Sequence, residues 1–228
     1  QEGWQAAIAL LCDSPEKFLE QISGRFALFW VDLARRQVGL ASDRFNTNGF
    51  CYSREGSRFS FADRANAVPA LHRELDQQAV FNYLYFHVIP APLTIFKNIL
   101  RLEPGYRLLA DGQGTNARPW WQARFEEPSD ADFQSSASTF RDLIKTAVER
   151  DLNGAPVGAF LSGGTDSSTV VGMLSRSGSP VTAYSIGFEA EGYDEMEFAR
   201  IAAKHFGVTH KPYYITSDDL VANIPSVA

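Results

Sequence analysis

The sequence has 228 residues, of which 45% are hydrophobic and 21% charged, and its formal net charge is −6. Two cysteines exclude a disulfide scaffold, and the acidic balance gives no reason to expect nucleic acid or a membrane surface as a partner. Because no apolar run approaches the roughly 20 residues that span a bilayer, we expect a cytoplasmic protein.

Short β-type runs dominate the first half of the chain. The run AAIALLC near the start predicts a helix, and five strand-like runs follow: RFALFWVDL, QVGLAS, GFCYS, RFSFAD and GYRLLA. Turn residues between them, such as Gly56 and the DGQG after Ala110, favour antiparallel hairpins. One helix interrupts the pattern, beginning at Asp76 and ended by the prolines of VIPAP. One side of this helix carries Val80, Tyr83, Leu84 and His87.

Helices and strands alternate in the second half. An acidic, polar stretch from 126 to 132 marks the predicted boundary, which gives domains of 1–125 and 126–228. After it we expect the helix FQSSASTFRDLIKTAVERDL, the strand VGAFL, a helix after the glycines, the strand VTAYSIGF, a helix from Met196 to Phe206 and the strand HKPYYI. Strands separated by helices of this length predict a parallel sheet.

A glycine turn joins the strand VGAFL to the following helix. Its sequence is Ser162–Ser168, SGGTDSS. Glycines allow close approach to the backbone, and the free N–H groups of a helix N-terminus attract anions, so we expect phosphate here, with serine hydroxyls as further donors. A Walker A loop is excluded because no lysine follows Gly164. The dinucleotide fingerprint lacks its third glycine, and a nucleophile elbow would need glycine in place of Phe160.

Asp166 is the unusual residue of the turn, because a carboxylate repels bound phosphate unless a cation lies between them. We therefore expect Mg²⁺, held partly by the phosphates. A loop that grips one end of a triphosphate without a lysine suits release of pyrophosphate and transfer of adenylate. The alternative is a turn that only links strand to helix, with Asp166 placed by the helix dipole.

The turn resembles the pyrophosphate loop of the ATP pyrophosphatases, and the segments GAFLSGGTDSSTVVGML and YSIGFEAEGYDEMEFARIAAKHFGVTHKPYYIT resemble the synthetase domain of the asparagine synthetase family. GRFALFWVDLARRQVGLASDRF and VIPAPLTIFKNILRLEPGYRLL are similar to the glutaminase domain of that family. The resemblance implies part of an antiparallel, Ntn-type glutaminase half, followed by part of a parallel-sheet ATP-pyrophosphatase half. It covers nearly the whole chain.

The resemblance also implies an activity and its residues. In that family glutamine is hydrolysed, and a carboxylate, such as aspartate, is adenylated by Mg-ATP and then attacked by ammonia. The expected partners are therefore ATP, glutamine or ammonia, and aspartate or an analogue, with a homodimer left open. Asp166 is the implied catalytic and metal residue. Pyrophosphate and Mg²⁺ would be held by Ser162, Gly163, Gly164, Asp166 and Ser167. Leu161 and Ile186, at the ends of adjacent strands, would flank the adenosine.

Three features depart from the family pattern. The family's nucleophilic cysteine follows the initiator methionine, whereas Cys12 and Cys51 are internal and are expected in the core, so we expect a longer protein of which this chain is an excerpt without a glutaminase site. The pattern Asp-Arg-x-Gly-x-Lys-Pro-Leu-Tyr-Tyr becomes DRFNTNGFCY, and Phe-Ala-Ser-Glu becomes FADR. The family's second loop, Ser-Gly-Glu-Gly-x-Asp-Glu, does not occur in this sequence.

Two alternatives remain open at this point. One is a divergent relative that closes a lactam or peptide ring while its glutaminase domain is inactive, an option suggested by DRFNTNGF. The other is a nucleotide-binding remnant without turnover. Asp194 and Glu195 could reach the metal, but we favour capping of the following helix. The four scattered histidines are not expected to take part directly in chemistry.

Overall fold

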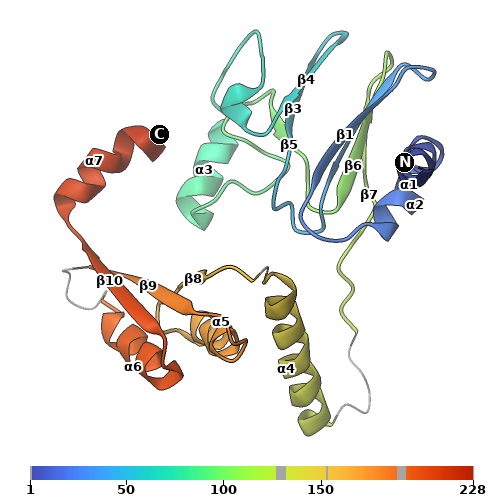
Figure 1. Cartoon of the computed structure of the whole chain (residues 1–228). Helices are drawn as coiled ribbons and strands as arrows, with labels where there is room; N and C mark the ends of the chain where they lie inside the picture. Colours follow the sequence, from blue (N-terminus) through green and yellow to red (C-terminus); the bar gives the residue numbers. More distant parts are fainter. Residues whose placement is uncertain (1, 127–131, 153, 189–193, 228) are drawn as a thin grey trace. The chain divides into compact units, whose positions relative to one another are not determined.

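The computed structural model describes residues 2–126, 132–152, 154–188 and 194–227. The chain divides into two compact units, Gln1–Glu126 and Glu127–Ala228. Most of the predicted boundary segment, residues 127–131, lies outside the described residues. Figure 1 labels the elements of both units, and each unit is described by itself below.

The first unit contains two antiparallel sheets and three α-helices among its described residues. Its elements in chain order are α1 (Glu2–Asp13), α2 (Pro15–Gln21), β1 (Ala27–Asp32), β2 (Gln37–Ser42), β3 (Cys51–Glu55), β4 (Arg58–Ala62), the 3-10 turn η1 (Ala65–Ala67), α3 (Gln77–Phe86), β5 (Leu100–Arg101), β6 (Tyr106–Ala110) and β7 (Thr115–Pro119). The strand orders are β1-β2-β6-β7 and β4-β3-β5, which confirms the expected hairpins.

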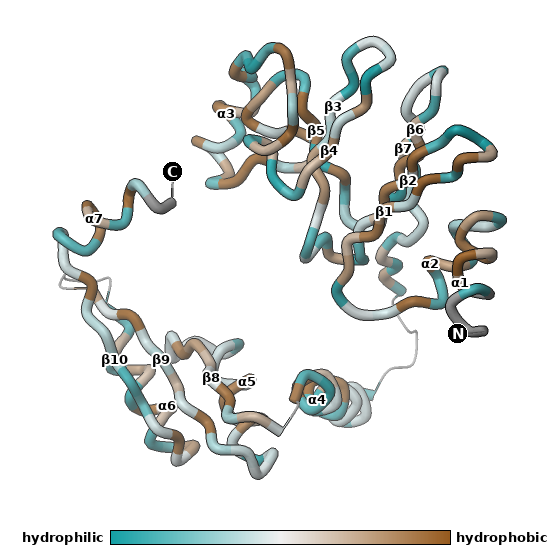
Figure 2. The backbone as a smooth tube through the Cα atoms, turned by 45° about the horizontal axis from the view of Figure 1, so that its top comes forward, coloured by the Kyte–Doolittle hydropathy of each residue, from teal (hydrophilic) through white to brown (hydrophobic). Residues whose placement is uncertain are grey.

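Three hydrophobic clusters hold the described part of this unit together, one of them formed by Cys51, Val68 and Ile99. One cluster lies between the two sheets. It includes Leu40 and Leu108 of the four-stranded sheet, Phe50 directly before β3 and Tyr52 in β3. On the other face of the four-stranded sheet, Leu19 of α2 packs in a cluster with Ala41 and Trp120. Figure 2 shows hydrophobic segments running through these strands. The unit is therefore a sheet-on-sheet core with α2 covering one outer face.

Helix α3 confirms its predicted start but not its predicted end. The Asp76 carboxylate accepts hydrogen bonds from the backbone N–H groups of Gln78 and Ala79, at 2.8 and 3.1 Å. The helix ends at His87, whose φ is +58° and whose N–H donates to the Tyr83 carbonyl, so the left-handed residue ends it before the first proline. The side that carries Val80, Tyr83, Leu84 and His87 is exposed, and the buried residue of the helix is Ala79.

The second unit contains a parallel sheet of order β10-β9-β8. Its elements in chain order are α4 (Phe133–Arg150), β8 (Val157–Phe160), α5 (Thr165–Ser175), β9 (Val181–Phe188), α6 (Met196–Phe206), β10 (Thr209–Ile215) and α7 (Ser217–Val227). The three strands are joined through α5 and α6 in linear order, so both crossover helices lie on one face of the sheet (Figure 1). The predicted parallel arrangement is confirmed.

Burial alternates along β9 because its two faces meet different neighbours. Ala183 is fully buried and packs with Val171 of α5 and Ala199 of α6, whereas Tyr184 and Ile186 point to the other face and are exposed. None of the described helices is long and apolar enough to cross a membrane. The mixed fold, antiparallel first and parallel second, agrees with the sequence prediction.

Candidate functional site

The glycine turn lies at the carboxyl end of β8. Leu161 extends the ladder by one residue, since its N–H donates to the Tyr184 carbonyl at 2.8 Å, and its side chain is 1% exposed. The chain then turns through Gly163, whose φ is +88°, and enters α5 at Thr165. The residue before the turn is therefore hydrogen-bonded to β9, and the turn lies at the edge of the sheet where parallel sheets bind their ligands.

Two serine hydroxyls close the turn on itself. The Ser162 N–H donates to Ser167 Oγ at 3.2 Å, the two hydroxyl oxygens lie 3.1 Å apart, and the Gly164 N–H donates to Ser162 Oγ at 3.3 Å. Ser167 Oγ also donates to the Gly164 carbonyl at 3.3 Å. These bonds join the two ends of the loop and keep both hydroxyls beside the start of α5.

The first turn of α5 offers backbone donors. Its N-cap residue is Gly164, which has no side chain to supply the oxygen that usually satisfies the first amides of a helix. Those amides carry the partial positive charge of the helix dipole. An anion seated here would accept hydrogen bonds from N–H groups that the helix itself leaves without an acceptor.

Gly163 is required by its surroundings as well as by its φ angle. A Cβ atom at this position would lie 2.5 Å from the carbonyl carbon of Phe198 and 2.5 Å from the nitrogen of Ala199. The backbone of α6 is therefore pressed against the turn. The turn is held between the starts of two helices, which limits how far it can relax.

Asp166 lies exposed in the first turn of α5. Among the described residues, no group of three or more His, Cys, Asp or Glu side chains is placed to hold a metal ion. Within the described part of the chain, Asp166 is the carboxylate that the first turn of α5 contributes. That donor set fits Mg²⁺, which commonly keeps several waters and binds through one or two carboxylates plus substrate phosphates.

Leu161 and Ile186 do not share one face of the sheet. Leu161 packs among the helices with Ala183, whereas Ile186 is 51% exposed on the opposite face. Ile186 borders a cavity of about 480 Å³ whose other walls are Tyr213, Ile215, Asp219, Leu220, Asn223 and Ile224. The contact of both residues with adenosine stays a prediction, and only the Ile186 side chain is exposed to meet a ligand directly.

Two further sequence expectations concern serine and acidic side chains. The Ser168 hydroxyl is buried and has no hydrogen-bond partner among the described residues, so it is not a donor on the surface of the loop. Asp194, the residue before the N-cap of α6, accepts the Met196 N–H on its Oδ1 at 3.2 Å, which agrees with the favoured capping role. Glu195 occupies the N-cap position but makes no side-chain cap bond within the described chain.

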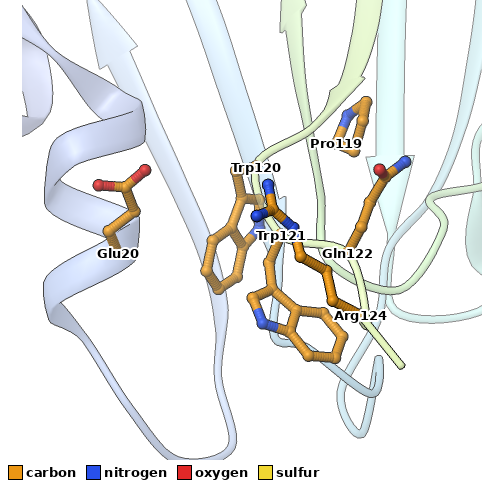
Figure 3. Close-up of a pocket in the computed structure, with 6 residues that line it drawn as sticks. All are labelled: Glu20, Pro119, Trp120, Trp121, Gln122 and Arg124. Atoms are coloured by element: carbon orange, nitrogen blue, oxygen red, sulfur yellow. The ribbon is translucent and has the colours of Figure 1, made fainter. Parts of the chain in front are cut away.

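A different pocket lies in the first unit (Figure 3). It measures about 580 Å³ and is lined by Glu20, Pro119, Trp120, Trp121, Gln122 and Arg124. Trp120 is 8% exposed and donates its indole N–H to the Ser42 carbonyl at 3.1 Å, so it belongs to the core. This pocket contains none of the residues predicted for phosphate binding.

Comparison with known proteins identifies both halves. The glutamine amidotransferase domain family matches residues 6–121, and the asparagine synthase family matches residues 139–228. The chain belongs to the asparagine synthetase family. Each family match falls within one of the two compact units.

Curated relatives agree with this assignment. A putative asparagine synthetase [glutamine-hydrolyzing] 2 of Methanocaldococcus jannaschii is 29% identical over 88% of this chain and 41% of the relative. Asparagine synthetase [glutamine-hydrolyzing] 1 of Bacillus subtilis is 26% identical over 93% of the chain and 34% of the relative. The amidase chry2 of Gibberella zeae is 25% identical over 90% and 33%. The chain thus spans 33% to 41% of the length of these relatives.

The segment DRFNTNGF departs from the asparagine synthetase pattern yet folds tightly around Asp43, which is 2% exposed. The Asp43 carboxylate accepts backbone N–H groups from Phe45 at 2.9 Å, from Thr47 at 3.1 Å and from Phe26 at 3.2 Å. Burial acts to raise the pKa of this carboxyl, but the hydrogen bonds from Phe45, Thr47 and Phe26 prevail, so the pKa lies below its ordinary value.

The same segment replaces a family glycine with Asn46. This residue has a φ of +53°, a conformation that asparagine tolerates better than most residues. Its Nδ2 donates to the Leu102 carbonyl at 3.0 Å, and its side chain lies over Gly49, where a Cβ would be 2.2 Å from Asn46 Oδ1. Asn46 and Gly49 therefore fit together, because the absence of a side chain at Gly49 leaves room for that of Asn46. Cys51, which follows, is buried as expected, and Cys12 is half-buried.

The prediction from sequence missed two residues beneath the loop, Ser185 and His210. Ser185 is 4% exposed in the middle of β9, and His210 is half-buried in β10. A signal was present: the alternation of VTAYSIGF places Ser185 on the same face as Ala183, where a polar side chain needs a partner.

Proposed function

We propose that residues 161–167 bind the pyrophosphate part of Mg-ATP, and that the protein is an ATP-dependent amidotransferase. It would adenylate a carboxylate, release pyrophosphate and form an amide with ammonia derived from glutamine. The observation that carries this proposal is the glycine-capped start of α5 with Asp166 in its first turn, in a chain of the asparagine synthetase family.

Each residue of the loop has a part in the proposal. The N–H groups at the start of α5 would donate to phosphate oxygens and hold them in place. The hydroxyls of Ser162 and Ser167, which bond within the loop, would turn their protons toward the phosphate when it binds. Asp166 would hold Mg²⁺ together with those oxygens, and the ion when bound neutralises phosphate charge. Gly163 keeps the loop close enough to α6 to be rigid. In the whole protein, the glutaminase domain to which residues 6–121 belong would supply the ammonia.

The segment DRFNTNGF, which suggested the ring-closing alternative, is held locally by Asn46, Gly49 and the hydrogen bonds to Asp43, and these contacts do not discriminate between the two reactions. We propose amide formation with aspartate or an analogue as the carboxylate, because curated relatives of the chain are named asparagine synthetases.

Calorimetric titration of the chain with ATP tests the proposal, because one substitution should change the ATP affinity in opposite directions with and without Mg²⁺. With Mg²⁺ present, Asp166→Asn should weaken ATP binding by about tenfold, because a carboxylate ligand of the ion is lost. In EDTA the same variant should bind ATP more tightly than the wild type, because a repulsive charge near the phosphates has gone. Asp142→Asn, on an exposed position of α4, serves as the matched control and should change neither value.

Two results would overturn the proposal. One is a wild-type chain that fails to bind Mg-ATP, which would leave no nucleotide site at this loop. The other is an Asp166→Asn variant whose affinity matches that of the wild type in both buffers. If binding is as expected, carboxylate-dependent exchange of labelled pyrophosphate into ATP by the whole protein tests adenylation, and aspartate should support it.

A further inference from the structure

A chain of hydrogen bonds runs from β10 through β9 to the base of the glycine turn. The Ser185 hydroxyl donates to the Leu161 carbonyl at 2.5 Å, and His210 Nε2 lies 2.8 Å from Ser185 Oγ. Ser185 is 4% exposed, so water has little access to this chain. Leu161 is the residue directly before the phosphate loop, and its N–H is already bound to the Tyr184 carbonyl.

The direction of these bonds follows from counting protons. A carbonyl oxygen can only accept, so the single hydroxyl proton of Ser185 points to Leu161. Toward His210, Ser185 Oγ must then accept, which requires a proton on Nε2 of the imidazole. Burial, and secondly the positive charge of Arg200, lower the pKa of His210 below its ordinary value, which favours the neutral imidazole. The bond to Ser185 then places the one proton of the neutral ring on Nε2.

The loop is thereby fixed from two sides. On one side, both polar backbone groups of Leu161 are bound by β9 and its side chains. On the other side, Gly163 is pressed against the backbone of α6 at Phe198 and Ala199. A loop held at its base needs little reordering when it binds an anion, and preorganisation of this kind raises affinity.

We propose that His210 is a positioning residue of the phosphate loop, acting through Ser185 on the Leu161 carbonyl. The inference rests on the proposed function, since it assigns a role in holding Mg-ATP. His210 does not touch the ligand in this role. It keeps the Ser185 hydroxyl oriented, and Ser185 keeps the base of the loop in place.

A matched pair of substitutions at Ser185 tests the bond itself. Threonine and valine have nearly the same shape, so Ser185→Thr and Ser185→Val fill the buried position alike and differ in the hydroxyl. We expect Ser185→Thr to bind Mg-ATP close to the wild-type affinity and Ser185→Val to bind roughly five- to tenfold more weakly. His210→Ala should weaken binding by a similar factor, and adding it to Ser185→Val should weaken binding no further. His205→Ala, an exposed histidine of α6, is the control.

Nitrogen-15 spectra of the imidazole provide a readout that a general loss of stability would not give. The wild-type chain should show His210 protonated on Nε2, and Ser185→Val should shift that nitrogen while Ser185→Thr leaves it nearly unchanged. The inference is overturned if the proton lies on Nδ1 or if the Ser185→Thr and Ser185→Val chains bind Mg-ATP equally. It is also overturned if the effects at Ser185 and His210 simply add. If the wild-type chain binds Mg-ATP but any of these three contradicting results is found, the proposed function stands and only the positioning role of His210 is refuted. A wild-type chain that binds no Mg-ATP overturns both.

Discussion

Replacement of Gly163 by alanine probes the packing of the phosphate loop, and Gly178 provides a matched control. Both glycines have left-handed backbones, with φ of +88° and +81°. They differ in their surroundings, because a Cβ at Gly178 meets nothing within 4 Å, whereas one at Gly163 lies 2.5 Å from backbone atoms of α6. The pair therefore separates the cost of the φ angle from the cost of the contact.

The magnitudes can be worked from these two features. A side chain in the left-handed region costs roughly 1–2 kcal/mol of unfolding free energy at either position. Overpacking against α6 adds about 1–3 kcal/mol at Gly163 alone. We therefore expect Gly178→Ala to lower the unfolding free energy by roughly 1–2 kcal/mol and Gly163→Ala to lower it by about 2–5 kcal/mol.

Urea unfolding followed by far-ultraviolet circular dichroism measures the difference. All four tryptophans lie in the first unit, so their fluorescence reports that unit, and neither substitution should move its midpoint. Gly163→Ala should also weaken Mg-ATP binding more than Gly178→Ala does. A Gly163→Ala chain no less stable than Gly178→Ala would refute the view that the turn is wedged against α6.

Three further predictions concern the first unit, and tryptophan fluorescence during urea unfolding measures each of them. Gly49→Ala should lower the free energy of unfolding by about 1–3 kcal/mol, because the new Cβ overlaps the Asn46 side chain. Adding Asn46→Gly should restore at least half of that loss, and purely additive effects of the two substitutions would contradict the proposed fit between these residues. Because the folded pKa of Asp43 lies below its unfolded value near 3.9, its contribution to stability is complete above that pH and is lost as the pH falls through the folded pKa. Asp43→Asn should remove this acid dependence, and parallel acid profiles of the two chains would argue against it. Trp120→Phe should lower the free energy of unfolding by about 1–3 kcal/mol, because it leaves the buried Ser42 carbonyl without its indole donor. An unchanged urea midpoint would contradict a stabilising role for that hydrogen bond.

Patterns within one element were predicted well from the sequence. Met196, Ala199 and Ala203 recur at helical spacing in the sequence, which predicts α6, and all three are buried in the structure. The strand VTAYSIGF appears as β9 with the alternating burial that its sequence indicates, and QVGLAS appears as β2, whose last four residues are all buried. The glycine turn was predicted from its own seven residues.

Relations between elements were predicted less well. The helical spacing of Phe133, Ala137, Phe140, Ile144 and Ala147 predicts α4 correctly. Phe133 and Phe140 on that side are nevertheless 78% and 63% exposed, because the spacing does not say what packs against the helix. Leu161 and Ile186 were expected to end neighbouring strands, but Leu161 follows β8 while Ile186 lies two residues before the end of β9, and the two face opposite sides. The bond between His210 and Ser185 likewise depends on the pairing of β10 with β9.

The most direct test of the central claim is a titration of the nitrogen-15-labelled chain with pyrophosphate and Mg²⁺, followed by amide spectra. If the turn holds pyrophosphate, the largest and earliest shifts will be those of the amides from Ser162 to Ser167, and Asp166→Asn will reduce them. Shifts confined to other residues, or none at all at saturating Mg²⁺ and pyrophosphate, would contradict the assignment of this loop.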